Sequence, residues 1–200
     1  RLASSDITAT WVAPVIAEYV RLHPGMQVEY HPSDHLVDLV AEGMDLTVRA
    51  TGRRDSSLRA APLATFDVWC VASPGYLNER GTPKRLAELA SHQWIAFTPI
   101  PQPWTLRTRD GEQSVHLNRF LSTSSTSGGR ALALAGAGVF GAPSLVVEHE
   151  VEAGRLVRVL PRLKFPQVFL YAAWAGRHEP PLKTRAFIEL AKARLKAPSR

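Results

Sequence analysis

The chain has 200 residues, of which 45% are hydrophobic and 21% charged, a balance typical of a globular protein with a sizeable core. No apolar run reaches the roughly 18 to 20 residues that a membrane helix needs, and the first residues are not expected to be an export signal. The net charge of +6 comes from scattered basic residues without an aromatic–basic platform, so we do not expect this chain to bind nucleic acid directly.

Short apolar runs alternate with longer amphipathic patterns in the first part of the chain, which predicts a parallel α/β sheet. We expect strands at 2–4, 27–31 and 45–50, and helices at 5–22 and 36–42. The segment 58–72 is long enough to form an extended strand that crosses between two lobes. The sequence contains one cysteine, Cys70, which lies in this segment, so an internal disulfide is excluded and a reducing cytoplasm is expected. We interpret Cys70 as a small buried hydrophobic residue.

The second part of the chain shows the same alternation of short apolar runs with amphipathic patterns, without a sequence repeat. The expected strands are 94–97, a hairpin of 104–107 with 114–117, then 121–123, 139–142, 156–160 and 168–175. The expected helices begin near 74 and 85 and then cover 124–135, 144–153 and 182–196. The sequence therefore predicts two similar α/β units joined by two long strands.

The first helix has more apolar surface than one core face requires. One stripe contains Trp11, Val15, Tyr19 and Leu22, and a second contains Val12, Ile16 and Val20. Together they cover about half of the circumference, whereas a single core face takes a stripe of about 100°. The helix is predicted to pack on its sheet and also to meet a partner; the alternative is a helix that its own unit covers well.

The segment 136–141 matches the spacing G-x-G-x-x-G literally. A dinucleotide site needs a strand before these glycines and a helix after them, and an acidic residue about 20 positions later. Here a helix comes first and a strand follows, and Pro161 and Arg162 stand where the acidic residue is expected. We interpret the glycines as the end of a helix and expect no cofactor.

Neither a metal site nor a catalytic site is expected. His31 and His35 are four residues apart, but Pro32 and Ser33 place a turn between them, so they do not share a helix face. The serines around Ser124 have no evident base, and a hydrolase that uses them remains only a rival hypothesis.

Polar residues follow three of the predicted strands and begin the next helix: Ser5, Asp6 and Thr8; Ser33 and Asp34; Ser124, Ser125 and Thr126. Helix capping explains each set alone. Together they favour a ligand site, because ligands in parallel α/β sheets bind beyond the carboxyl ends of the strands. Backbone N–H groups at helix starts favour an anion there, and hydroxyls add directional donors.

Seven short motifs occur in order along the chain, at 22–29, 38–49, 55–58, 72–77, 135–139, 154–157 and 183–188. In this order they resemble the effector-binding domain of LysR-type transcriptional regulators across essentially the whole chain. The resemblance implies an α/β fold like that of type 2 periplasmic binding proteins, with lobes at 1–71 plus 171–200 and at 72–170. It also implies a winged helix-turn-helix DNA-binding domain upstream, which is absent from this chain.

The resemblance implies which residues contact the effector in the cleft between the lobes. They are Ser5, Asp6, Thr8, Ser33 and Asp34 on one side and Phe97, Ser124, Ser125, Thr126, Phe140 and Pro143 on the other. Asp6 stands where small or hydroxyl residues are common, and its carboxylate would repel an anionic effector unless Arg49 or a cationic ligand offsets it. Subunits are expected to pair through Trp11, Val15, Tyr19 and Tyr30.

The function that these observations favour is effector sensing by a cytoplasmic regulator. The expected partners are a small molecule, a second copy in a homodimer (a tetramer in the full-length protein) and, through the absent domain only, DNA. No enzyme activity, cofactor, metal or membrane contact is expected. The alternative is an extracytoplasmic solute-binding protein of the same fold.

Overall fold

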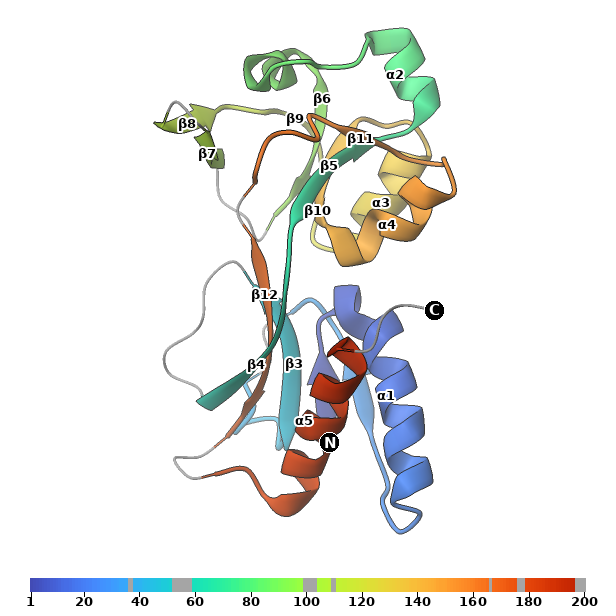
Figure 1. The fold of residues 1–200 in the computed structure, drawn as a ribbon, viewed down its shortest axis with the longest axis vertical. Helices are drawn as coiled ribbons and strands as arrows, with labels where there is room; N and C mark the ends of the chain where they lie inside the picture. The colour runs from blue at the N-terminus through green and yellow to red at the C-terminus, as the bar shows by residue number, and fades with distance from the viewer. Residues whose placement is uncertain are drawn as a thin grey trace. The chain divides into compact units, whose positions relative to one another are not determined.

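A computed structural model describes residues 1–35, 38–51, 59–98, 104–108, 111–165, 167–175 and 179–196. The chain forms two compact units: unit 1 combines Arg1–Thr65 with Phe169–Arg200, and unit 2 is Phe66–Val168. Each unit has a five-stranded sheet with helices packed on it (Figure 1). The predicted α/β class is therefore confirmed.

The sheet of unit 1 has the strand order β2-β1-β3-β12-β4. Its strands are β1 (Leu2–Ser4), β2 (Tyr30–Pro32), β3 (Leu46–Thr51), β4 (Arg59–Phe66) and β12 (Val168–Trp174). β1 runs parallel to both β2 and β3, whereas β12 runs antiparallel to β3. The predicted strands at 2–4, 45–50 and 168–175 are confirmed within a residue or two, while β2 begins at Tyr30, later than expected.

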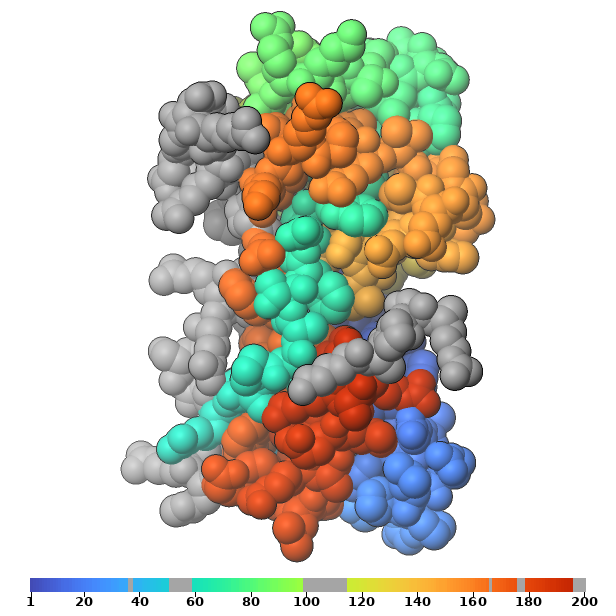
Figure 2. Space-filling view, in the orientation of Figure 1, coloured from blue at the N-terminus to red at the C-terminus, as the bar shows by residue number. Residues whose placement is uncertain are grey.

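Two long helices lie side by side in unit 1 (Figures 1 and 2). They are α1 (Ala9–Leu22), which follows the 3-10 turn η1 (Asp6–Thr8), and α5 (Leu182–Lys196). Tyr19 joins them, because its hydroxyl donates to the Lys183 carbonyl at 3.0 Å and its ring centroid lies 5.5 Å from that of Phe187. The two helices are therefore held together by contacts between residues that are far apart in the sequence.

The helix predicted at 36–42 is wrong over residues 38–42, which form turns; residues 36 and 37 lie outside the described residues. The Asp38 carboxylate accepts hydrogen bonds from the backbone N–H groups of Val40 and Ala41 at 2.9 and 3.0 Å. Leu39 and Met44 are buried in a small cluster with Ala3. Local side-chain capping and these two buried anchors stabilise a turn where the apolar spacing predicts a helix.

The sheet of unit 2 has the strand order β11-β5-β10-β6-β9. Its strands are β5 (Val68–Ala72), β6 (Gln93–Phe97), β9 (Asn118–Thr123), β10 (Val139–Pro143) and β11 (Val157–Val159). β6 is parallel to both β9 and β10, and β5 is antiparallel to β10. The expected hairpin is confirmed as β7 (Trp104–Thr108) paired with β8 (Gly111–Val115).

Helices cover this sheet. They are α2 (Pro74–Arg80), the 3-10 helix η2 (Leu86–Ser91), α3 (Thr126–Leu134) and α4 (Ser144–Glu152). One buried cluster contains Cys70, Leu89 and Trp94, and a second contains Ile95 and Phe140. Cys70 is fully buried, as predicted, and burial raises the pKa of its thiol well above the usual range.

Gly136 and Gly138 form the connection from α3 to β10, which confirms their interpretation as a helix end, whereas Gly141 lies within β10. Gly136 has a φ of +83°, a conformation that favours glycine. At Gly138 an added Cβ would lie 2.5 Å from the Gln93 carbonyl oxygen. These glycines therefore allow a tight turn into a buried strand.

Gly129→Ala is expected to destabilise unit 2. Its Cβ would lie 2.3 to 2.9 Å from ring atoms of Phe140, which is 1% exposed and has no room to move. Overpacking of this kind costs about 1–3 kcal/mol. Urea unfolding checks the loss, and Phe140→Leu in the Gly129→Ala background should restore part of it.

Gly75→Ala is the matched control for this prediction. No atom lies within 4 Å of a Cβ added at Gly75, and the residue is in the first turn of α2. The free energy of unfolding should stay unchanged or rise by up to about 1 kcal/mol. Equal stability of the two alanine variants would contradict the close packing of Phe140 against α3.

Candidate effector-binding site

Three parallel strands of unit 1 end at the same edge of the sheet. Ser4 at the end of β1 pairs with Pro32 of β2 and with Val48 of β3. β12 enters the unit at this edge too, because Phe169 pairs with Thr51. The edge therefore brings together the predicted contacts Ser5, Asp6, Thr8, Ser33 and Asp34.

A carboxylate from one loop holds the start of the first helix. Asp34 Oδ1 accepts the Asp6 backbone N–H at 2.9 Å, and the Ser33 N–H donates to the Ser4 carbonyl at 2.8 Å. The predicted side-chain caps are wrong for this helix, since neither Ser5 nor Thr8 makes one. The cap comes instead from a residue 28 positions away.

Arg49 fixes the loop that carries Asp34. Its guanidinium donates to the Ser33 carbonyl at 3.1 Å and to the His35 carbonyl, and the residue is only 9% exposed. Burial lowers the pKa of Arg49, while nearby Tyr171 and Asp34 oppose that shift. Arginine nevertheless stays charged in proteins, so a buried cation lies behind this edge.

The hydroxyl groups at this edge bond to one another. Ser5 and Thr8 are both buried, and Thr8 Oγ1 donates to the Ser5 carbonyl at 2.8 Å. Ser4 Oγ lies 2.8 Å from the Tyr30 hydroxyl. Of the five predicted contacts in unit 1, Asp6, Ser33 and Asp34 reach the surface, whereas Ser5 and Thr8 lie beneath it.

The parallel strands of unit 2 also end together. Phe97 of β6 pairs with Thr123 of β9, while Pro143 at the end of β10 pairs with Val68, where β5 enters the unit. The α3 helix starts at this edge, and its predicted cap is confirmed, because Ser125 Oγ accepts the Gly128 N–H at 3.1 Å.

The predicted contacts in unit 2 differ in exposure. Ser124 is exposed, and Phe97, Ser125 and Pro143 are half-buried, so all four reach the surface of this edge. Thr126 is buried, and Phe140 packs beneath Gly129 in the core instead of forming a wall at the surface. The burial of Phe140 could not be predicted from its residue type, because the space that its ring fills exists only where Gly129 has no Cβ.

The residues predicted at a subunit interface also separate into two groups. Val15 and Tyr19 are buried inside unit 1, where a partner could not reach them. Trp11 and Tyr30 are half-buried, as are Ile16 and Val20 on the other stripe of α1. The part of α1 that is open to a partner therefore comes from both stripes: Trp11 and the exposed Leu22 from the first, and Ile16 and Val20 from the second, whose Val12 is buried.

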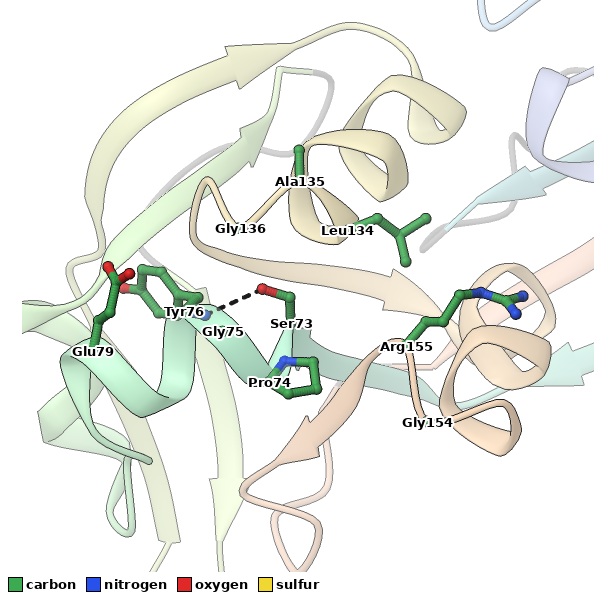
Figure 3. Close-up of a pocket in the computed structure, with 10 residues that line it drawn as sticks. All are labelled: Ser73, Pro74, Gly75, Tyr76, Glu79, Leu134, Ala135, Gly136, Gly154 and Arg155. Carbon is green, nitrogen blue, oxygen red and sulfur yellow. Dashed lines mark hydrogen bonds between the residues drawn. The ribbon is translucent and has the colours of Figure 1, made fainter.

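A pocket of about 820 Å³ lies elsewhere in unit 2 (Figure 3). It is lined by Ser73, Pro74, Gly75, Tyr76, Glu79, Leu134, Ala135, Gly136, Gly154 and Arg155, none of which the sequence predicted as a site residue. The pocket is at the far end of the sheet, because it surrounds the last turn of α3 and follows the end of β5. Glu79 and Arg155 lie on opposite sides of it, and Arg155 Nε binds Glu150 Oε2 at 2.5 Å, which lowers the pKa of Glu150.

Within the described ranges, no three His, Cys, Asp or Glu side chains gather as a metal site would require. His31 Nε2 instead contacts Glu29 Oε1 at 2.8 Å. No helix in the described part of the chain is long and apolar enough to cross a membrane.

Two α/β units, each with parallel strands that end at a helix start, are typical of the fold of type 2 periplasmic binding proteins. The regulatory domain of CrgA from Neisseria meningitidis has this fold, with a TM-score of 0.83, 24% identity and 97% of each chain covered. The effector domain of AmpR from Pseudomonas aeruginosa superposes with a TM-score of 0.75 and 17% identity, over 98% of this chain and 96% of that chain. The predicted fold is confirmed.

Residues 1–196 match the family model of the LysR substrate binding domain, and the chain belongs to this family. It is 38% identical over 192 residues to the HTH-type transcriptional regulator PtxR of Pseudomonas aeruginosa, covering 94% of this chain and 61% of that protein. It is 28% identical over 188 residues to the transcriptional activator AaeR of Escherichia coli, covering 92% and 60%. The chain thus spans about three fifths of these relatives, which are transcriptional regulators rather than enzymes.

Proposed function

We propose that this chain senses a small polar or aromatic metabolite for a transcriptional regulator, by binding it between the two units. The observation that carries the proposal is the position of the strand ends. In each unit, the parallel strands end and a helix starts at the edge where the chain passes to the other unit. Ligands of parallel α/β sheets bind at such edges.

A ligand that contacts both edges stabilises the arrangement in which they face each other. It shifts the equilibrium only by the difference between its affinities for the closed and open arrangements. In the proposed mechanism, this difference changes the geometry of subunits on DNA. We assign DNA contact to a winged helix-turn-helix domain in another part of the full-length protein. We propose that the full-length protein acts in the cytoplasm.

The relatives support this proposal over a solute-binding protein of the same fold. PtxR and AaeR are both described as HTH-type regulators, and the chain covers nearly the same share of each. A carrier of nutrients would share the fold but not these relatives.

Thermal unfolding in the presence of a metabolite panel tests the proposal. At least one compound should raise the Tm, and Ser33→Ala or Ser124→Ala should weaken its binding by about 2- to 12-fold, the value of one hydrogen bond. Ser33 is half-buried in unit 1 and Ser124 is exposed in unit 2, so the two variants probe the two edges separately.

Ser91→Ala is the matched control, because Ser91 is exposed and ends η2, which precedes the opposite end of β6. Its affinity for the stabilising compound should equal that of the wild type. A panel without any stabilising compound, or a compound whose binding ignores both edge variants, would overturn the assigned site.

We further propose that the chain forms homodimers through α1 and the neighbouring edge of β2, and tetramers in the full-length protein. On one flank of α1, Glu18 pairs with Arg194 of α5 at 2.5 Å and Tyr19 bonds to Lys183. Ile16 and Val20 lie on the flank away from these contacts and are partly exposed. An apolar surface of this kind favours association.

Val20→Glu should convert the dimer to a monomer in sedimentation velocity, because it places a charge on the apolar flank. Ala193→Glu adds the same charge at an exposed position of α5 and should leave the dimer intact. A wild-type monomer, or equal association of the two variants, would rule out this interface.

A further inference from the structure

We propose that His92 is an acid-sensitive switch in unit 2: its protonation breaks the hydrogen bond to Tyr76 and loosens α2 from the start of β6. The switch lies wholly within unit 2 and does not depend on the effector site proposed above. Three observations carry it: a short helix with few buried residues, a hydroxyl that is bonded on both sides, and a buried histidine whose acceptor nitrogen is occupied.

The attachment of α2 depends on Tyr76. The helix has seven residues, and only two of them, Tyr76 and Leu77, are buried. Both belong to the buried cluster that contains Trp94. The Tyr76 hydroxyl accepts the Gln93 N–H at 2.9 Å and lies 3.1 Å from His92 Nδ1. This hydroxyl therefore joins α2 to the residues at which η2 ends and β6 begins.

The hydrogen bonds of Tyr76 determine which nitrogen of His92 carries the proton. The phenol oxygen already accepts the Gln93 N–H, and Tyr76 is 4% exposed. A buried hydroxyl hydrogen needs an acceptor, and among the described residues His92 Nδ1 is the one that the hydroxyl contacts. Nδ1 therefore accepts this hydrogen, and neutral His92 carries its own on Nε2.

Protonation of His92 and its bond from Tyr76 exclude each other. A second proton can bind only at Nδ1, the nitrogen that the hydroxyl occupies. Once protonated, Nδ1 is a donor, and the Tyr76 hydrogen loses its acceptor. The new charge is also buried, because His92 is 7% exposed. A buried charge and an unpaired hydroxyl both destabilise the packed arrangement, and movement of α2 lets water reach the two side chains.

The groups around His92 come from α2, η2 and the adjoining strands. α2 brings Arg80 and η2 brings Glu88, and both act on the charge of His92. The adjoining strands β6 and β9 pair Gln93 with Asn118, both of which are uncharged. Within the described part of the chain, one anion and one cation therefore act on this histidine.

Burial is the strongest of these influences on His92. It lowers the pKa of His92, Glu88 opposes this shift, and Arg80 adds to it. The Glu88 carboxylate is engaged elsewhere, because it accepts the Lys84 backbone N–H and Arg85 Nε, both at 2.8 Å. His92 therefore stays neutral at a pH at which an unfolded histidine is already charged.

The pH dependence of the switch follows from this direction. An unfolded histidine has a pKa of about 6.5, and that of His92 in the folded protein is lower. Below about pH 6.5 the unfolded chain binds more protons than the folded one, so the stability that neutral His92 contributes is complete above this pH and is lost as the pH falls. The pocket in Figure 3 should change too, because α2 supplies Pro74, Gly75, Tyr76 and Glu79 to its lining.

NMR titration of the 200-residue chain tests the switch directly. His92 should titrate at a lower pH than the histidines of the urea-unfolded chain. The Gln93 amide proton reports its bond to Tyr76, so its signal should shift with the midpoint of His92. Tyr76→Phe removes the donor to Nδ1, and the midpoint of His92 should then move to higher pH.

His92→Asn removes the titrating group and keeps an acceptor near the position of Nδ1. From about pH 7.5 to about pH 5.5, the unfolding constant of the wild type in urea should rise at least about 3-fold more than that of His92→Asn. His116→Asn is the matched control, because His116 is exposed to solvent in the folded chain. Its pH dependence should equal that of the wild type.

Four results would each overturn the switch. They are a His92 midpoint equal to that of the unfolded chain, a Gln93 signal that does not follow it, an unchanged midpoint in Tyr76→Phe, and equal pH dependence of the wild type and His92→Asn. If Tyr76→Phe does not fold, the titration of the wild type and the stability of His92→Asn still decide the question.

Discussion

The direction of the parallel strands constrains everything else in this molecule. β1, β2 and β3 end at one edge of unit 1, and β6, β9 and β10 end at one edge of unit 2. The first backbone N–H groups of a helix have no partner inside the helix, so polar groups must gather where a helix follows such a strand. The same edges are those through which the chain passes between units.

The two units meet this requirement differently. In unit 2 the cap is local, because Ser125 accepts the Gly128 N–H three residues later and leaves the exposed Ser124 beside it. In unit 1 the cap is long-range, since Asp34 reaches the Asp6 N–H from the end of the neighbouring strand. The helix start of unit 1 is thus closed by a carboxylate of the protein.

Much of the fold could be predicted because its signals are local. The alternation of strands and helices, the cap at Ser125 and the burial of Cys70 all follow from patterns within a few residues. The errors involve contacts between distant segments. The carboxylate of Asp34, instead of the side chain of Ser5, caps the first helix by accepting the N–H of Asp6, which is 28 residues away. The absence of a Cβ at Gly129 leaves room for the Phe140 ring in the core. The turn near Asp38 likewise depends on burial of Leu39 against Ala3, and the spacing of apolar residues along the chain cannot predict this distant contact.

Hydrogen exchange measured by mass spectrometry tests the central claim most directly, with the compound from the metabolite panel that raises the Tm most. Binding between the units should slow exchange at two places together, residues 4–8 with 33–35 in unit 1 and residues 123–129 in unit 2. The pocket around residues 73–79 and 134–136, at the far end of the unit 2 sheet, should exchange as in the free protein. Protection confined to that pocket, or to one unit only, would contradict a ligand site shared by the two edges.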